Sequence, residues 1–294
     1  MALAPVIDLH THSNHSDGTQ SPGDVVRSAS QAGLDVVALT DHDVASGWAE
    51  ADAVASEVGL LLVPGIEVSC KTALGISVHM LAYRPDPLSA AFLGSMEQVR
   101  EFRADRLRRQ VDLLRKDGFR VELAEMLAHA QPGATLGRPH LADALVRAGH
   151  FANRDEAFAQ ILGAGKPYYL PVDAPDPVDV VQMIRAAGGV PVMAHPFASL
   201  RGRVVSDAVI HELTEAGLAG LEADHRDHDE AARKHARQLA ATLGLLVTGS
   251  SDYHGTGKLN ALAENTSSLE VLEALMQQGT GSPLMGTGAL PTRA

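Results

Sequence analysis

The feature that most constrains the fold is the segment Val6–Gly18, in which a short apolar run leads directly into histidines and a carboxylate. The apolar residues within positions 6–9 are largely β-branched and predict a buried strand. His10, His12 and Asp17 follow where this strand gives way to a polar turn. A strand that delivers imidazole and carboxylate groups at its carboxyl end is a common way for an α/β scaffold to build a metal site.

The same alternation of apolar strand, polar residues and helix recurs along the chain. We expect strands at 35–40, 60–63, 76–82, 190–194, 218–222 and 245–248, with helices at 21–32, 46–58, 177–187, 206–216 and 230–243. This rhythm predicts parallel βα units whose sheet is covered on both faces. The last 15 residues are rich in Gly, Pro and Thr and are expected to be irregular.

The rhythm is interrupted between residues 88 and 172, where helical patterns replace strands. The expected helices cover 96–117, 122–131, 139–149 and 154–162. We therefore expect a barrel made of residues 1–87 and 173–294, and a helical insertion of residues 88–172 that forms part of the substrate site. Residues 97–120 hold eight Arg or Lys against five Asp or Glu. This excess fits either a solvated face with i,i+4 ion pairs or a wall that faces an anionic substrate.

Composition limits the partners and the compartment. The net charge of −12 argues against broad adhesion to nucleic acid or to an anionic membrane. The single cysteine excludes an internal disulfide and suits a reducing compartment, so we expect a cytoplasmic protein. We predict neither a signal peptide nor a membrane-spanning helix, and we infer no stable protein partner.

Histidines and carboxylates gather after the predicted strands. Nine such side chains form the candidate catalytic and metal-binding set: His10, His12, Asp17, His42, Glu67, His79, His195, Asp252 and His254. Each histidine alone is more simply explained as a hydrogen-bonded loop residue, but in a parallel barrel all carboxyl ends of strands converge on one face. His15 is a neighbour that could replace Asp17.

Nine ligands are too many for one ion and fit a cluster of two or three, with Glu67 as the expected bridge. A set of imidazoles and carboxylates without thiolate suits manganese, our first choice, or zinc or iron. Adjacent divalent ions lower the pKa of a bound water and neutralise charge on phosphoryl oxygens, which are the requirements of phosphate ester hydrolysis.

These segments resemble the motifs of a known family. The matching motifs are DLHTHS at 8–13, SDG at 16–18, LTDH at 39–42, GIE at 65–67, AHP at 194–196 and SDYH at 251–254. They are similar to those of the PHP (polymerase and histidinol phosphatase) family, a branch of the amidohydrolase-like barrels. The resemblance implies an α/β fold, a distorted (β/α)7 TIM-like barrel with an inserted helical subdomain, and two or three divalent cations.

The resemblance also implies which residues hold each cation. The three ligand groups would be His10, His12, Glu67 and Asp252; Glu67, His79 and His195; and Asp17, His42 and His254. Asp8 and Asp41 are expected to accept hydrogen bonds from ligand histidines and so to orient them.

Within the family, the chain most resembles the stand-alone enzymes that remove phosphate from 3′,5′-nucleoside bisphosphates such as pAp, some relatives of which trim RNA from its 5′ end. The segments GRPHLA at 137–142 and GKPYY at 165–169 carry part of this likeness. Arg138 could make a bidentate contact with a phosphate, His140 could donate a hydrogen bond and Lys166 could supply a positive charge. In the competing interpretation, a helix begins at residue 139 and Arg138 lies on a surface. His225 is a further candidate contact to phosphate or to the leaving group.

The expected activity is metal-dependent hydrolysis of the 3′-phosphate of a nucleoside bisphosphate by a metal-bound hydroxide. A histidinol-phosphate phosphatase, a general nucleotide phosphomonoesterase and an exonuclease on short RNA 5′ ends stay open as alternatives. A non-catalytic regulatory domain that binds metal and nucleotide is the alternative from another class. An amidase or lactonase is also chemically feasible.

Overall fold

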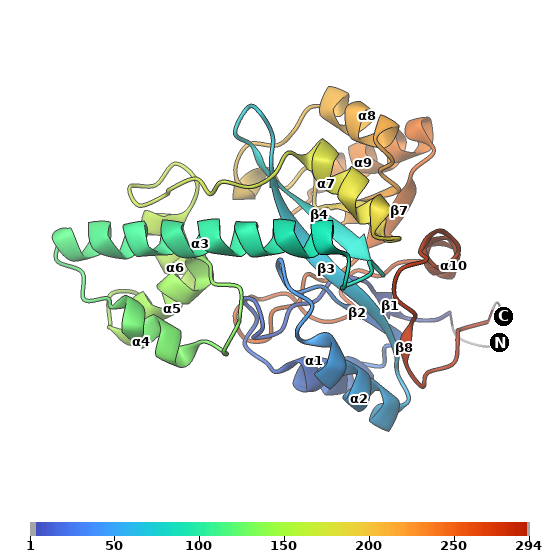
Figure 1. Cartoon of the computed structure of the whole chain (residues 1–294), viewed down its shortest axis with the longest axis horizontal. Helices are drawn as coiled ribbons and strands as arrows, with labels where there is room; N and C mark the ends of the chain where they lie inside the picture. Colours follow the sequence, from blue (N-terminus) through green and yellow to red (C-terminus); the bar gives the residue numbers. More distant parts are fainter. Residues whose placement is uncertain (1–3, 293–294) are drawn as a thin grey trace.

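The computed structural model describes residues 4–292, and these residues form an eight-stranded sheet with helices around it (Figure 1). The strands are β1 (Ile7–Asp8), β2 (Val36–Leu39), β3 (Leu61–Lys71), β4 (Ser77–Tyr83), β5 (Val190–Ala194), β6 (Gly220–Asp224), β7 (Leu246–Gly249) and β8 (Met285–Gly286). They pair in the order β1 to β7, and β8 pairs with β3. The short strand β8 lies in the tail that we expected to be irregular, so that expectation was wrong for these two residues.

One strand departs from the predicted parallel arrangement. β4 is antiparallel to both β3 and β5, whereas the pairs β1–β2, β2–β3, β5–β6 and β6–β7 are parallel. The connection between Lys71 and Ser77 is too short for a parallel crossover, which needs about a dozen residues or more. Glu67 and His79 consequently lie within paired strands. The sequence analysis had instead assumed that each lies at the end of a strand.

The open edges of the sheet meet next to the predicted metal ligands. Thr11 and Tyr253 form an isolated parallel bridge, and the backbone N–H of His12 donates to the Tyr253 carbonyl at 2.8 Å. The segments after β1 and after β7 therefore lie side by side and nearly close the barrel. This contact brings the first and last motifs of the chain to the same place.

The helices fall largely where the sequence predicts them. They are α1 (Pro22–Gln31), α2 (Trp48–Val58), α3 (Ala90–Lys116), α4 (Leu123–His129), α5 (Arg138–Arg147), α6 (Arg154–Ala157), the π-helix η1 (Phe158–Leu162), α7 (Pro177–Ala186), the 3₁₀-helix η2 (Ser199–Arg201), α8 (Asp207–Glu215), α9 (Glu230–Leu243) and α10 (Leu269–Gln278). At the start of α1 the Ser21 side chain accepts a hydrogen bond from the N–H of Asp24, as the Ser-Pro pattern predicts. No helix of the described chain is both long enough and apolar enough to cross a membrane.

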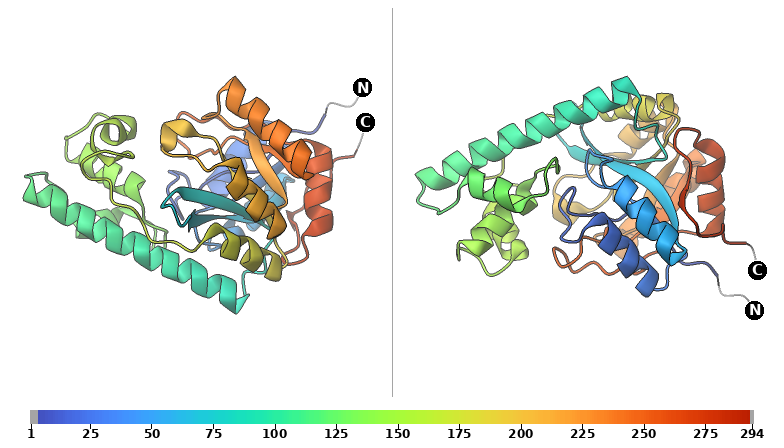
Figure 2. Two further views of the ribbon diagram at one scale, coloured as in Figure 1. Left: turned by 90° about the horizontal axis from the view of Figure 1, so that it is seen from above. Right: turned by 60° about the horizontal axis from the view of Figure 1, so that its bottom comes forward.

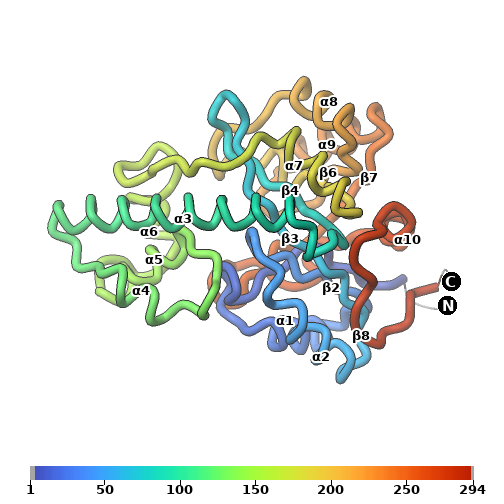
Figure 3. Tube along the Cα trace, viewed as in Figure 1, coloured from blue at the N-terminus to red at the C-terminus, as the bar shows by residue number. Residues whose placement is uncertain are grey.

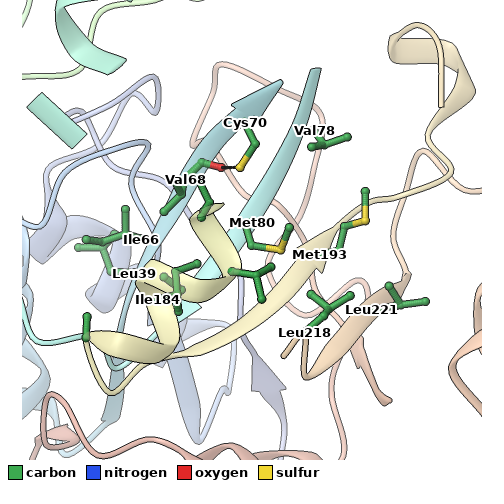
Figure 4. Packing of buried hydrophobic residues seen from close by; sticks show 14 of the residues in the cluster. Leu39, Ile66, Val68, Cys70, Val78, Met80, Ile184, Met193, Leu218 and Leu221 are labelled. Carbon is green, nitrogen blue, oxygen red and sulfur yellow. Dashed lines mark hydrogen bonds between the residues drawn. The ribbon is translucent and has the colours of Figure 1, made fainter. Parts of the chain in front are cut away.

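Strand residues divide between two apolar clusters because alternate side chains point to opposite faces. In β2, Val37 and Leu39 join the cluster between the sheet and the surrounding helices, whereas Val36 and Ala38 join the cluster inside the barrel. Figure 4 shows part of the outer cluster, which includes Met80 of β4, Leu221 of β6 and Ile184 of α7. Both faces of the sheet are therefore buried, which explains why its strands read as continuous apolar runs.

The segment 88–172 has a third apolar cluster of its own, which includes Leu107, Val111 and Leu114 of α3 and residues of α4 to η1. The first part of α3 packs with the barrel instead, through Phe92 and Met96. Figures 2 and 3 show α3 running from the barrel to the far end of the molecule, with α4, α5 and α6 on one side of its distal half. We propose on this basis that residues 88–172 form a helical subdomain anchored to the barrel by α3.

Candidate metal centre

The structure brings the nine predicted side chains into one cluster at the mouth of the barrel, and we call the space between their ligand atoms the pocket. His10, His12 and Asp17 come from the segment after β1, and the others from β3, β4 and the segments after β2, β5 and β7. Three groups have ligand atoms that lie within 4.8 Å of one another: His10, His12, Glu67 and Asp252; His12, Asp17 and His254; and His42, Glu67 and His79. Most of these side chains are fully buried.

Glu67 lies at the middle of this pocket. Its Oε1 is 2.8 Å from Nδ1 of His79 and 3.1 Å from Nε2 of His195, and its Oε2 is 3.1 Å from both His42 and His12. A carboxylate whose two oxygens face different imidazole groups has the geometry of a bridge between cations. The position of Glu67 is thus the one that the sequence analysis expected for a bridging ligand.

The grouping of ligands differs in detail from the one that the family resemblance implies. His42 groups with Glu67 and His79, and its Nε2 lies 3.9 Å from Asp17. His12 completes the group of Asp17 and His254, whose Oδ1 and Nε2 atoms are 3.0 Å apart. The two nitrogens of His42 therefore face two neighbouring groups.

The backbone at the centre is held in an uncommon conformation. His195 and Asp252 have φ values of 32° and 54°, and Asp43, which follows His42, has a φ of 53°. Non-glycine residues with positive φ cost free energy and tend to cluster at functional sites. The fold tolerates this strain at the positions that turn side chains into the pocket.

Groups around the pocket fix the direction of the ligand nitrogens. The carboxylate of Glu222 in β6 lies 3.0 Å from Nδ1 of His10, and this leaves the Nε2 lone pair of His10 for a cation. The sequence analysis missed Glu222. Asp8, to which it assigned this role, accepts from the backbone N–H of the ligand His10 at 3.4 Å, and also from those of Ser251 and Ala263, but contacts no histidine ring by hydrogen bond.

Asp41 reaches the metal-binding set only through other residues. It accepts hydrogen bonds from the backbone and hydroxyl of Ser13 and from the Ser16 hydroxyl, and Ser16 in turn contacts Nδ1 of His12 at 3.2 Å. This chain fixes the ring of His12 without direct contact between Asp41 and a ligand histidine.

The charges in the pocket call for cations. Burial alone would lower the pKa of His10, but the carboxylates of Glu222, Glu67 and Asp252 outweigh this effect and raise the pKa well above its usual value. Burial would also lower the pKa of His12, but contacts with Asp252 and Glu67 raise it to about 9. Burial lowers the pKa of His195 to about 3, with help from Arg201, which leaves this imidazole neutral. The carboxylates therefore favour protonated His10 and His12 in the metal-free protein, and divalent cations would take the place of these protons among the buried ligands.

The candidate substrate residues of the insertion differ in their contacts and exposure. Nδ1 of His140 accepts the N–H of Gly137, so its Nε2 carries the proton, and its electrostatic partners include Asp17 and Arg103. One guanidinium nitrogen of Arg138 donates to the Leu162 carbonyl at 3.0 Å, and the group lies over the rings of Tyr169 and Phe158. Lys166 is exposed in the loop after η1.

His225 is completely buried. Its Nδ1 accepts the N–H of Asp227, so Nε2 carries the proton. This Nε2 lies 3.4 Å from Oδ2 of Asp252 but forms no hydrogen bond in the described chain, and the contact of His225 with phosphate stays a prediction.

The sequence analysis counted the basic residues of this helix but did not single out two buried arginines of α3. Arg103 pairs with Asp43 at 2.9 Å and donates to the Ser69 hydroxyl at 2.5 Å. Arg106 is 7% exposed, and its Nε has no hydrogen-bond partner among residues 4–292. Other basic residues of α3 are solvated, as in the i,i+4 pair of Asp105 and Arg109. The exposed face of α3 thus fits the solvated interpretation, and a contact of the buried arginines with an anionic substrate stays a prediction.

Comparison with known proteins agrees with this geometry. The PHP domain profile matches residues 8–162. A 3′,5′-nucleoside bisphosphate phosphatase of Chromobacterium violaceum is 31% identical over 86% of this chain and 88% of its own. A 5′-3′ exoribonuclease of Haemophilus influenzae is 32% identical over 84% and 89% of the two chains, respectively.

Two further relatives extend the range. A phosphoribosyl 1,2-cyclic phosphate 1,2-diphosphodiesterase of Eggerthella lenta is 32% identical over 84% of this chain and 94% of its own. A crystal structure from Bifidobacterium adolescentis, provisionally described as a metal-dependent phosphoesterase, covers 95% of this chain and 98% of its own with a TM-score of 0.90 and 37% identity. The motifs, the barrel and these similarities together establish that the chain belongs to the PHP-domain family of metallophosphoesterases.

Proposed function

We propose that this protein hydrolyses a phosphate monoester of a small nucleotide that carries a second phosphate, with 3′,5′-nucleoside bisphosphates as the preferred substrates. The cations sit among the nine ligands, most of which are buried, and a separate arginine cluster holds the phosphate that is not cleaved. The observation that carries the proposal is this cluster of Arg103, Arg106 and Arg138 beside the pocket.

The ligand set fits divalent cations on evidence from this chain alone. Asp17 Oδ1 and His254 Nε2 lie 3.0 Å apart, but neither buried atom forms a hydrogen bond in the described chain. The same holds for Nδ1 of His42 and Nδ1 of His79, which lie 3.1 and 2.8 Å from the Glu67 carboxylate. Unpartnered buried polar atoms are costly, and a cation on each group would supply their partner. When bound, two or three cations would activate a water and neutralise charge on the phosphoryl group. Manganese is our first choice, with zinc and iron as alternatives.

The arginine cluster fits a phosphate because its positive charge is only partly compensated. Asp43 pairs with Arg103, while Arg106 lacks a partner for its buried Nε. Burial, together with Arg103 and Arg138, lowers the pKa of Arg106 to about 9. Three guanidinium groups beside one carboxylate leave roughly two positive charges, and a phosphate dianion would balance them.

The cluster lies next to the cation ligands. Arg103 reaches Asp43, which follows the ligand His42, and it acts electrostatically on His42 and on His140. A substrate with two phosphates can therefore place one over the cations and the other among the arginines.

His140 interacts electrostatically both with Asp17 of the cation ligands and with Arg103 of the arginine cluster. Burial lowers its pKa, so the ring is neutral at pH 7, and its protonated Nε2 is free to donate a hydrogen bond. We assign His140 to the ester oxygen or to a phosphoryl oxygen near it. Lys166 is exposed, and a contact with substrate would require it to reach in from the rim.

The second phosphate also separates the competing activities. The named substrates of the relatives from Chromobacterium violaceum and Eggerthella lenta each contain two phosphates, and RNA contains many. Histidinol phosphate has one phosphate and would leave the arginines without a partner. A non-catalytic regulatory domain would not need the complete set of ligands.

Phosphate release from the manganese-loaded protein tests the proposal. We expect pAp to be hydrolysed with a kcat/KM well above that of adenosine 3′-monophosphate, which has the same scissile bond but lacks the second phosphate. Histidinol phosphate completes the phosphate-release panel. Cleavage of a 5′-phosphorylated oligoribonucleotide and of a phosphoribosyl 1,2-cyclic phosphate is followed by chromatography of the products, because hydrolysis of a phosphodiester bond releases no free phosphate. Equal turnover of pAp and adenosine 3′-monophosphate would contradict the assignment, and faster cleavage of the oligonucleotide or the cyclic ester would replace pAp as the substrate.

A further inference from the structure

A single arginine of the insertion reaches into the segment that carries one of the cation groups. Arg154, at the start of α6, is held by Asp143 of α5 through Nε at 2.5 Å and Nη2 at 2.6 Å. Its remaining nitrogen, Nη1, donates to the backbone carbonyl of Asp17 at 3.0 Å. The side chain is 13% exposed, so this guanidinium is largely removed from water.

The same guanidinium also packs against the segment after β7. A Cβ on Gly257 would lie 2.2 Å from Nη1 of Arg154, so the backbone there approaches the arginine as closely as only glycine allows. Gly257 and Thr19 both donate through their backbone N–H groups to the carbonyl of His254, at 3.3 and 3.1 Å. Arg154 therefore touches the two segments that present Asp17 and His254.

Asp17 and His254 belong, with His12, to one cation group, which we call the outer group. The carboxylate of Asp17 and the imidazole of His254 come from segments that are more than 200 residues apart in the sequence. Their 3.0 Å approach depends on how these two segments are held against each other. Arg154 is well placed to hold them, because Asp143 fixes its orientation through two hydrogen bonds.

We propose that Arg154 is a positioning residue that ties cation binding at the outer group to docking of the helical insertion onto the barrel. The proposal rests on the cation centre of the proposed function and adds that one of its groups is completed from outside the barrel. Residues that orient a metal ligand typically change metal affinity by about 10- to 100-fold when they are removed. The other two groups have no contact with Arg154 in the described chain and should keep their affinities.

The test is a titration of the metal-free protein with Mn²⁺, in which free Mn²⁺ is measured by its electron paramagnetic resonance signal. For the wild type we expect three binding events. For Arg154→Met we expect one of them to weaken by about 10- to 100-fold, with the other two unchanged. At a Mn²⁺ concentration that refills the outer group, the kcat of the variant should recover while its KM for pAp stays near the wild-type value.

A control variant and a second test variant show whether weaker Mn²⁺ binding comes from the loss of this contact or from a general loss of folding. Arg120→Met removes a similar bond, from Nη2 to the Ala148 carbonyl at 2.9 Å, but this bond lies wholly within the insertion. Its titration should match the wild type. Asp143→Asn keeps Arg154 and weakens its anchor, so the same single event should weaken to a smaller extent.

The outcomes separate this inference from the proposed function. If the wild type hydrolyses pAp and Arg154→Met binds all its cations as the wild type does, the inference alone is overturned. Uniform weakening of every event in Arg154→Met also overturns it, since that would mark a general structural role. If the wild type shows only two binding events, the outer group is not a cation site and the inference is overturned, while the bisphosphate assignment stands. If the wild type binds no Mn²⁺, both the inference and the proposed function are overturned.

Discussion

Replacement of Arg106 by methionine should separate the function of this side chain from its effect on stability. In the free protein the guanidinium is buried without a partner for its Nε. It is still charged at neutral pH, but the fall of its pKa from 12.5 to about 9, caused by burial and by the neighbouring arginines, corresponds to a cost of roughly 5 kcal/mol. Removal of an uncompensated buried charge is therefore expected to raise the free energy of unfolding, by about 1–2 kcal/mol once imperfect packing of methionine is allowed for.

The same change should impair catalysis in a substrate-dependent way. Charge-assisted hydrogen bonds between the guanidinium and the second phosphate contribute about 2–3 kcal/mol, which corresponds to a loss of roughly 30- to 150-fold in kcat/KM for pAp. Adenosine 3′-monophosphate has no such phosphate, so its kcat/KM should change by less than about 3-fold. Steady-state kinetics with both substrates, combined with thermal unfolding, measures all of these quantities.

Arg109→Met is the matched control, because Arg109 lies on the exposed face of α3 and pairs only loosely with Asp105 at 3.9 Å. It should leave both the kinetics and the unfolding temperature near wild type. An equal loss on both substrates, or a lower unfolding temperature for Arg106→Met, would refute the reasoning, because Arg106 would then be a structural residue.

Three further predictions address the cation centre. Asp17→Asn or His254→Ala should reduce turnover by at least ~100-fold, because either change removes a ligand of the outer group; near-normal phosphate release would refute a role for that group. Glu222→Gln should weaken the tightest Mn²⁺ event by about 10-fold or more, because His10 loses its charged acceptor, and an unchanged titration would contradict that role. Because contacts with Asp252 and Glu67 raise the pKa of His12 to about 9, Mn²⁺ uptake at pH 7.5 should release protons, and affinity should rise with pH up to about 9. Calorimetry in two buffers of different ionisation enthalpy measures this proton release, and identical heats would count against it.

The sequence predicted the barrel and the ligand set because both depend on local patterns. A short apolar run followed by His10 and His12 marks the end of a strand, and such ends converge in a barrel. The strand β4 was predicted, but its antiparallel direction was missed, because an apolar pattern carries no information on direction. Only the short connection between Lys71 and Ser77 could have revealed a hairpin.

The residues outside the ligand set were harder to predict, because their roles depend on tertiary contacts. Glu222 reads as an ordinary residue at the end of a strand, and its role appears only when β6 lies beside β5 and His10. Arg103 and Arg106 carried a usable signal. Both occur at positions of α3 that share the buried face of Val99 and Leu107, where an apolar residue would be expected.

The central claim is that distant segments of the chain jointly hold several divalent cations at the mouth of this barrel. Anomalous X-ray diffraction from crystals of the manganese-loaded protein tests it directly. The account predicts two or three manganese peaks between Glu67, Asp17 and Asp252. A well-ordered crystal with no peak in this pocket, or with manganese bound elsewhere, would contradict it.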